Sequence, residues 1–201
     1  MFCFAVTGGI GSGKSYLVRL MEAFGIPAYI ADIRAKELYK TDSVLLGHLV
    51  KLLGNEILHN GELRREIMAA KIFSNQKLLS RVNEIVHPSV LNDFMNWRTV
   101  KEREGFSTVI FESAIFLESP LFHFIADKVI VVCAPEEVRI QRVMKRDNVS
   151  EELVRERIAR QWNDEKRQLM ADFIIFADGK RAIMPQIIEV FNKSGIKPVL
   201  R

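Results

Sequence analysis

The chain has 201 residues, of which 48% are hydrophobic and 27% are charged, and its formal net charge is +4. A chain of this length can bury a good core as one domain, and no apolar run approaches the length of a membrane span. The small positive charge suits an anionic small molecule and does not require nucleic acid as a partner.

The two cysteines, Cys3 and Cys133, both lie in apolar, strand-like runs that are far apart in the sequence. This placement favours buried, reduced thiols over a disulfide and indicates a cytoplasmic location. The apolar start of the chain has no basic segment before it and stops at Gly8, too early for a signal peptide.

The first predicted strand, Phe2–Val6, runs directly into a glycine-rich segment that matches the phosphate-binding loop motif G-x-x-x-x-G-K-[ST]. Glycines let successive backbone N–H groups turn inward toward an anion. Lys14 adds a charge near the β- and γ-phosphates, and the Ser15 hydroxyl can reach Mg²⁺. The residues expected to contact a nucleotide are Gly9, Ile10, Gly11, Ser12, Gly13, Lys14, Ser15 and Tyr16. A glycine-rich turn without a ligand is the alternative, but the strand–loop–helix context that the motif demands is present.

Five short apolar runs are predicted as strands: Phe2–Val6, Ala28–Ile30, Thr108–Phe111, Lys128–Val132 and Phe173–Phe176. Most of them are separated by helical patterns. This alternation predicts an α/β fold in which a parallel five-stranded sheet is flanked by helices on both faces. The helix after the phosphate loop is expected over residues 16–24, where Gly25 and Pro27 end it.

Residues 42–105 interrupt the alternation with helical periodicity and no convincing strand, so we interpret them as a helical insertion within a single domain, residues 1–201. Asn60-Gly61 is expected to form a turn, followed by helices around Leu63–Phe73 and Val90–Arg103. Five leucines before the turn are expected on one helix face: Leu45, Leu46, Leu49, Leu52 and Leu53.

A second interruption, residues 142–168, is crowded with charge. From Ala134 to Met170, seven arginines face eight acidic residues. Such a run is usually a solvated pair of helices linked by ion pairs. In a phosphate-binding protein it can also be a mobile lid whose arginines reach the nucleotide. The sequence leaves these two alternatives open.

Carboxylates at strand ends are further candidates, because ligands of a parallel α/β sheet bind beyond the carboxyl ends of its strands. Asp32 follows the second strand, where it can orient an acceptor hydroxyl or take its proton; alternatively, it caps a helix over Ile33–Tyr39. Glu112 follows the third strand, where it can hold Mg²⁺ through water; alternatively, it is a solvated strand end.

Other residues carry weaker signals when they are taken alone. His87-Pro88 is expected to open a helix with the proline at its first position, which leaves His87 to cap or pack. Arg65 has the pattern of an exposed helix arginine. Trp97 and Trp162 lie in amphipathic segments and are expected to be partly buried packing residues.

These segments together resemble the dephospho-coenzyme A kinase family. The resemblance rests on Thr7–Ser15, Ala31-Asp32, Gly61–Arg65, His87-Pro88 and the set Arg142, Arg146 and Gln161, and it runs from Ala5 to about Gly179. It implies an ATP-dependent kinase that phosphorylates the 3′-hydroxyl of dephospho-coenzyme A, the last step of coenzyme A synthesis. The implied fold is a P-loop kinase core with a helical acceptor domain in residues 42–105 and a lid in residues 142–168.

The resemblance also implies roles for individual residues. Asp32 would be the catalytic carboxylate, with Lys14 on the transferred phosphoryl group. Arg142 and Arg146 would serve the nucleotide phosphates from the lid side. The acceptor side would be formed by Asp32, Arg65, His87 and Glu118. Ser15 and Glu112 stay the candidates for holding Mg²⁺, on the phosphate-loop motif and the strand end.

The chain departs from the family pattern at several positions. Ile30 and Asp178 stand where the family has Asp and Asn, Ala114 replaces a proline, and Tyr16 replaces a common threonine. Two other functions stay open: a P-loop kinase of another small acceptor, such as a nucleoside monophosphate or shikimate, and a nucleotide-binding regulatory module. A guanine-specific switch is disfavoured, because Gly195 stands where the N-K-x-D motif requires Asp.

Overall fold

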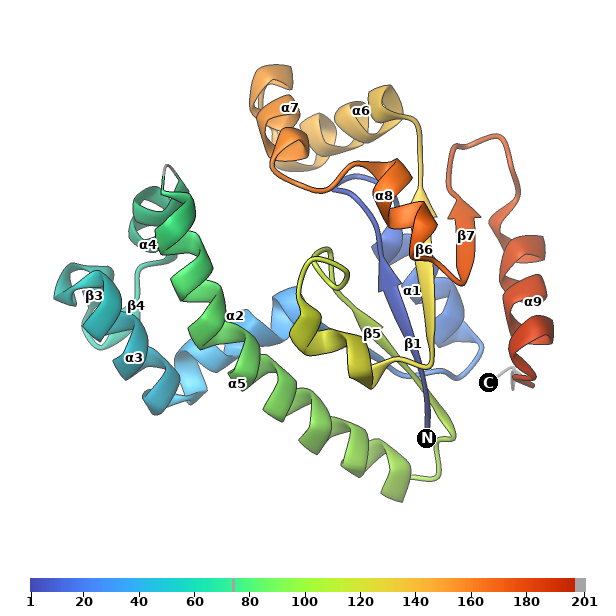
Figure 1. Ribbon diagram of the computed structural model, residues 1–201, viewed down its shortest axis with the longest axis horizontal. Coiled ribbons are helices and arrows are strands. Elements are labelled where there is room, and N and C mark those ends of the chain that lie inside the picture. Colours follow the sequence, from blue (N-terminus) through green and yellow to red (C-terminus); the bar gives the residue numbers. More distant parts are fainter. Residues whose placement is uncertain (74, 198–201) are drawn as a thin grey trace. The chain divides into compact units, whose positions relative to one another are not determined.

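The computed structural model describes residues 1–73 and 75–197 (Figure 1). The chain forms two compact units: residues 1–29 together with the chain from residue 100 onward, and residues 30–99. Within the described residues, none of the helices combines the length and the apolar character that a membrane span requires.

The first unit is built on a five-stranded sheet with the strand order β2-β5-β1-β6-β7 (Figure 1). Its strands are β1 (Phe2–Thr7), β2 (Ala28–Ile30), β5 (Thr108–Glu112), β6 (Lys128–Cys133) and β7 (Phe173–Phe176). β1 pairs in parallel with β5 and β6, and β6 pairs in parallel with β7. The prediction of a parallel α/β sheet is confirmed, and each strand lies within one residue of its predicted bounds.

Both faces of this sheet are covered, which explains why its strands are continuous apolar runs. Phe4 of β1 packs toward Phe191 of α9 (Ile183–Ser194), with ring centroids 6.5 Å apart. Phe111 of β5 pairs in register with Ala5 and therefore points to the face opposite to Phe4. There it contacts Phe122 of the 3₁₀ helix η2 (Pro120–Ile125), with ring centroids 5.2 Å apart.

The other helices of the first unit are α1 (Lys14–Ala23), α6 (Glu136–Asp147), α7 (Glu151–Ala159) and α8 (Asp164–Leu169). α1 packs against β1, β5 and α9, and α8 packs against β6. α6 and α7 share a small apolar cluster formed by Ile140, Val143 and Val154. The charge-rich stretch therefore has an apolar seam beneath its ionic surface.

The two cysteines are buried in the first unit. Cys3 lies on β1 and Cys133 ends β6, and neither forms a disulfide. This confirms the expectation of buried, reduced thiols. Burial raises the pKa of the Cys133 thiol to about 11, so the thiol stays protonated near neutral pH.

The second unit is mostly helical, as predicted. It contains α2 (Ala31–Thr41), α3 (Ser43–Leu53), the 3₁₀ helix η1 (Asn55–Ile57) and α4 (Arg65–Phe73). It also contains an antiparallel hairpin of β3 (Leu58–His59) and β4 (Glu62–Leu63), so the expectation of no strand in this region was wrong. Two-residue strands are too short to show the alternation by which a strand is recognised. Positive φ angles at Asn60 and Gly61, 52° and 81°, make the tight turn that the sequence predicted.

The long helix α5 (Gln76–Arg103) corrects two expectations. It begins well before Val90, and Pro88 lies inside it rather than at its first position. A proline inside a helix removes one backbone hydrogen bond, and its ring crowds the carbonyl four residues earlier. This helix is held on both sides of Pro88 by buried Val82, Val86 and Phe94. Packing thus carries the helix through a residue that usually ends one. In α3, three of the five predicted leucines form the buried face, Leu45, Leu49 and Leu53, whereas Leu46 and Leu52 are half-buried.

Candidate active site

The phosphate loop joins β1 to α1 at the carboxyl end of the sheet. Gly8, Gly11 and Gly13 have φ angles of 148°, 76° and 105°, a region that favours glycine. Gly13 is the N-cap of α1, so the helix begins at Lys14 with its first N–H groups facing the loop. These donors and the positive helix end form a site for an anion.

Two side chains of the loop have polar groups aimed into it. Lys14 Nζ donates to the carbonyl oxygens of Gly8 and Gly9, at 2.9 and 3.2 Å, so the side chain folds back along the loop. Ser12 is 1% exposed, and among the described residues its hydroxyl has no hydrogen-bond partner. A buried hydroxyl of this kind costs free energy unless a ligand satisfies it. Both groups fit a bound phosphate.

Arg142 of α6 connects the loop to the segment after β7. Its Nη2 donates to the carbonyl of Ala177 at 2.8 Å, and its Nη1 donates to those of Gly11 and Ser12 at 3.3 and 3.4 Å. Arg142 also lines a pocket of about 500 Å³ beside the loop, together with Gly13, Tyr16, Ala177, Ile183 and Met184. Tyr16 is 57% exposed there, which is unusual for an aromatic side chain and offers a ring to a planar ligand.

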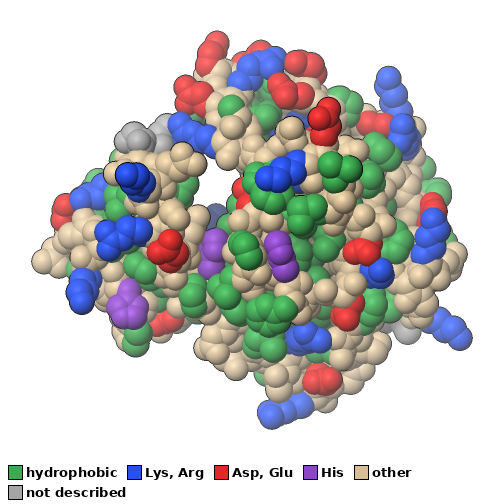
Figure 2. All heavy atoms as spheres, viewed as in Figure 1, with side chains coloured by type: hydrophobic (Ala, Val, Ile, Leu, Met, Phe, Trp, Pro, Cys, Tyr) green, Lys and Arg blue, Asp and Glu red, His purple; other side chains and the backbone are tan. Residues whose placement is uncertain are grey.

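Among the described residues, Arg146, unlike Arg142, forms no hydrogen bond with the phosphate loop. Its side chain is 62% exposed and forms two hydrogen bonds with Asp147, at 2.7 and 3.0 Å. These bonds hold the pKa of the Asp147 carboxyl below its usual range. Acidic and basic side chains are intermixed over α6 and α7 (Figure 2). The structure thus brings only one of the two predicted lid arginines to the phosphate loop.

Glu112 is buried at the root of the phosphate loop. It is the last residue of β5, pairs in register with Val6 of β1, and is 5% exposed. The burial of Glu112 shows that the alternative of a solvated strand end is wrong. The segment after β5 is tied to β1 by Ser113 N–H, which donates to the Val6 carbonyl at 3.1 Å.

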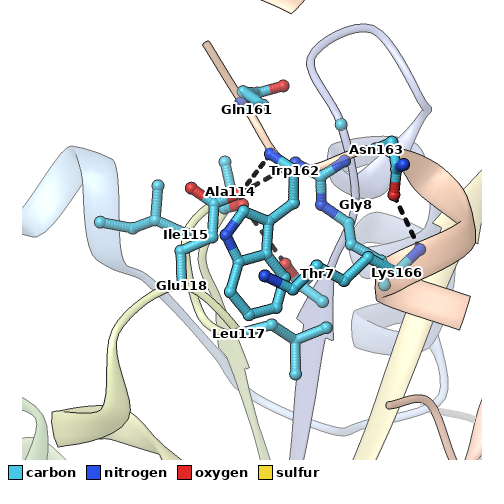
Figure 3. Close-up of polar contacts among 12 residues, drawn as sticks. Thr7, Gly8, Ala114, Ile115, Leu117, Glu118, Gln161, Trp162, Asn163 and Lys166 are labelled. Atoms are coloured by element: carbon cyan, nitrogen blue, oxygen red, sulfur yellow. Dashed lines mark hydrogen bonds and ion pairs between the residues drawn. The ribbon is translucent and has the colours of Figure 1, made fainter. Parts of the chain in front are cut away.

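Glu118 lies further along the segment after β5. Its Oε1 accepts hydrogen bonds from the backbone N–H of Trp162, at 3.1 Å, and from Arg167 Nη2, at 3.0 Å (Figure 3). Trp162 is half-buried, with Lys166 Nζ 3.4 Å from the centre of its ring. This carboxylate, which the resemblance assigned to the acceptor, thus also anchors the chain before α8.

The second unit carries the other predicted residues. Asp32 is exposed and is the second residue of α2, so the alternative that it caps a helix starting at Ile33 is wrong. The backbone of Ile30 is still extended, and the helix starts at the next residue.

Tyr39, seven residues after Asp32, was not predicted from the sequence. Burial raises the pKa of its phenol, the Asp32 carboxylate raises it further, and Arg65 lowers it. Asp32, Tyr39 and Arg65 are therefore close enough to interact electrostatically. The spacing of seven residues puts Asp32 and Tyr39 on one helix face, which was the available signal. His87 lies inside α5, where burial lowers the pKa of its imidazole.

Comparison with known proteins decides the family. The family model for dephospho-CoA kinase matches residues 2–182. The chain belongs to the dephospho-CoA kinase family. The dephospho-CoA kinase of Bacteroides fragilis (strain YCH46) is 39% identical over 185 residues, covering 92% of this chain and 89% of the relative. That of Porphyromonas gingivalis is 39% identical over 193 residues, covering 96% and 94%.

Solved structures agree on the fold. A crystal structure from Thermus thermophilus has a TM-score of 0.81 at 25% identity, covering 96% of this chain and 97% of that one. Dephospho-CoA kinase from Campylobacter jejuni has a TM-score of 0.67 at 24% identity, covering 96% of both chains. A shikimate kinase from Acinetobacter baumannii shares the fold at a TM-score of 0.53 and 14% identity, covering 98% of this chain and 96% of that one. Kinases named for different acceptors thus share this fold, and the sequence match decides the family.

Proposed function

We propose that this member of the dephospho-CoA kinase family transfers the γ-phosphoryl group of ATP to the 3′-hydroxyl of dephospho-coenzyme A, giving ADP and coenzyme A. The observation that carries the proposal is the complete phosphate loop, from Gly8 to Ser15, in a chain that the family model covers over residues 2–182.

On the nucleotide side, the loop residues from Gly9 to Tyr16 surround the phosphates, and backbone N–H groups that follow Ile10 in the loop donate to them. Lys14 meets the negative charge that develops on the transferred group. The orphaned Ser12 hydroxyl supports this arrangement, because a phosphate oxygen would satisfy it. The pocket beside Tyr16 and Arg142 takes the base, since its size and exposed ring suit a planar heterocycle.

Mg²⁺ is the metal that such a site would take. The Ser15 hydroxyl and the Glu112 carboxylate are oxygen donors of the kind that Mg²⁺ prefers, and it usually keeps only one or two protein ligands besides phosphates and water. Ser15 and Glu112 would hold it, Glu112 through water. When bound, Mg²⁺ draws negative charge from the phosphate oxygens.

On the acceptor side, Asp32 orients the 3′-hydroxyl and accepts its proton, while Arg65 and His87 contribute to binding. Glu118 is assigned to the same side. The electrostatic coupling of Tyr39 to both Asp32 and Arg65 supports a shared polar site. Residues 42–105 make the acceptor subdomain, and residues 142–168 make a lid that brings Arg146 toward the phosphates on closure. We place the enzyme in the cytoplasm.

The test is a choice of acceptors. The protein is supplied with ATP, Mg²⁺ and one of three acceptors (dephospho-coenzyme A, a nucleoside monophosphate or shikimate), and ADP is measured by a coupled assay. We expect ADP above background only with dephospho-coenzyme A, with coenzyme A identified by its mass. ADP formation with either other acceptor, and none with dephospho-coenzyme A, would overturn the proposal.

A further inference from the structure

Ile10, in the middle of the phosphate loop, is held at both its backbone N–H and its backbone carbonyl by side chains from far along the chain. Its N–H donates to Gln161 Oε1 at 2.8 Å, and its carbonyl accepts from Arg139 Nε at 3.0 Å. The loop is rich in glycine, so its backbone has much conformational freedom to lose. Two anchors on the backbone of one residue remove part of that freedom.

Arg139 is well suited to hold a fixed position. It is 4% exposed, and its charge is balanced by Asp164, with Nη1 2.7 Å from Oδ2. The other oxygen of Asp164 accepts from Arg167, which is 1% exposed and also pairs with Glu118 at 3.0 Å. Leaving any of these charges buried and unpaired would be costly. The Arg139 side chain therefore stays where its Nε meets the Ile10 carbonyl.

The loop also fits around Arg139 by shape. A methyl group at Gly11 would lie 2.5 Å from the Arg139 carbonyl oxygen, and one at Gly9 would lie 2.6 Å from Nη2. Only glycine leaves room at these two places. The contact between the loop and α6 is thus steric as well as polar.

We propose that Gln161 and Arg139 are positioning residues, which we call the loop clamp, that fix the backbone of Ile10 and thereby the course of the loop from Gly11 to Ser15. The inference rests on the proposed function. The Ile10 N–H is used by Gln161, so the clamp acts through the donors that follow it in the loop. Those donors must bond the γ-phosphoryl group as its charge redistributes. A small displacement of the loop weakens their hydrogen bonds more in the transition state than in the ground state.

Gln161→Ala tests the clamp, because Gln161 is neutral and half-buried and its loss leaves the ion pairs intact. We expect kcat to fall roughly tenfold, with the KM for ATP changed by less than about threefold. Arg155→Ala is the matched control. Arg155 belongs to the same charged stretch, but it is bonded to the exposed acids Glu136, Glu137 and Glu151. Equal kcat values for Gln161→Ala and the control would overturn the clamp.

A second variant tests whether the two side chains act on the backbone of the same residue. Arg139→Lys keeps the charge near Asp164 but loses the Nε that donates to Ile10. We expect the double variant with Gln161→Ala to lower kcat by less than the product of the two single effects, because both substitutions remove anchors of Ile10. Effects that multiply would mean that the two residues act independently, contrary to the clamp. If Arg139→Lys does not fold, the Gln161→Ala measurements decide.

A third measurement does not depend on the acceptor. Amide hydrogen exchange of a peptide covering residues 7–16 is followed in the wild type, Gln161→Ala and Arg155→Ala. We expect faster exchange in Gln161→Ala alone, with unchanged exchange in the central strands. An unchanged rate in Gln161→Ala would overturn the clamp. A wild type that does not phosphorylate dephospho-coenzyme A would instead refute the proposed function and leave this measurement valid.

Discussion

Gly9 lies directly against the guanidinium of Arg139: a methyl group at Gly9 would be 2.6 Å from Nη2 and 2.7 Å from Cζ. Gly9 is not among the glycines with positive φ, unlike Gly8. The backbone conformation of Gly9 is open to other residues, but the space beside it has no room for a side chain. The glycine is therefore required by packing, because the arginine that occupies the space is buried and ion-paired.

Gly9→Ala should destabilise the protein by about 1–3 kcal/mol, the usual cost of overpacking a tight site, and should lower kcat by displacing the loop. Gly47→Ala is the control, since Gly47 lies inside α3 and a methyl group there meets nothing within 4 Å. That variant should be stabilised by up to about 1 kcal/mol, because alanine favours a helix. Denaturant unfolding and steady-state kinetics measure both effects. A Gly9→Ala variant as stable and active as the wild type would show that Arg139 moves aside freely.

Lys14→Ala should leave the fold intact, because the Lys14 side chain lies along the surface loop, where its Nζ donates to the carbonyls of Gly8 and Gly9. It removes the charge that meets the transferred phosphoryl group, so turnover should fall by at least about a hundredfold, or roughly 3 kcal/mol. Lys193→Ala, which removes an exposed lysine paired with Glu189 on α9, serves as the control. Near-normal turnover of Lys14→Ala would mean that the loop is not used for transfer.

The sheet could be predicted from the sequence because every strand in it is buried on both faces. Continuous apolar runs such as Phe2–Thr7 and Lys128–Cys133 need no knowledge of their neighbours to be recognised. The phosphate loop is likewise a local motif. The β3–β4 hairpin was missed because its strands have two residues each.

The contacts around the loop could not be predicted in this way. Arg139, Gln161 and Asp164 are separated from Ile10 by more than a hundred residues, and each has the pattern of a solvated helix residue in a charged stretch. Only the folded chain brings Arg139 and Gln161 to the backbone of Ile10 and Asp164 to Arg139. The position of Pro88 was predicted wrongly for a different reason. Proline usually lies at the start of a helix, but the packing of α5 overrides this local preference.

The stability of the protein should depend on His87 in acid. Burial lowers the pKa of this imidazole, so the folded state binds its proton less tightly than the unfolded state, whose pKa is about 6.5. The contribution of His87 is therefore fully present above about pH 6.5 and is lost as pH falls through the lower folded value. Urea unfolding between about pH 7.5 and pH 5 should show a smaller loss of stability in His87→Gln than in the wild type. An identical pH dependence in the two proteins would contradict this.

Asp32→Asn separates a catalytic role from a structural one. Asp32 is exposed in the first turn of α2 and does not cap it, so the change should cost at most about 1 kcal/mol of helix-dipole interaction. Asparagine cannot take the proton of the acceptor hydroxyl or orient it with a charge. Turnover should therefore fall by roughly two to four powers of ten, while thermal stability and ATP binding stay nearly unchanged.

Two further measurements sharpen this test. Asp42→Asn is the matched control, because Asp42 caps α3 by accepting from Leu45 N–H and asparagine caps as well as aspartate; it should keep full turnover. In Asp32→Asn the pKa of the Tyr39 phenol should also fall, since the carboxylate that raises it is gone, and a spectroscopic titration of the tyrosines measures this. A drop in the phenol pKa with full turnover would show that Asp32 faces Tyr39 without acting on the acceptor, and the catalytic assignment would then be abandoned.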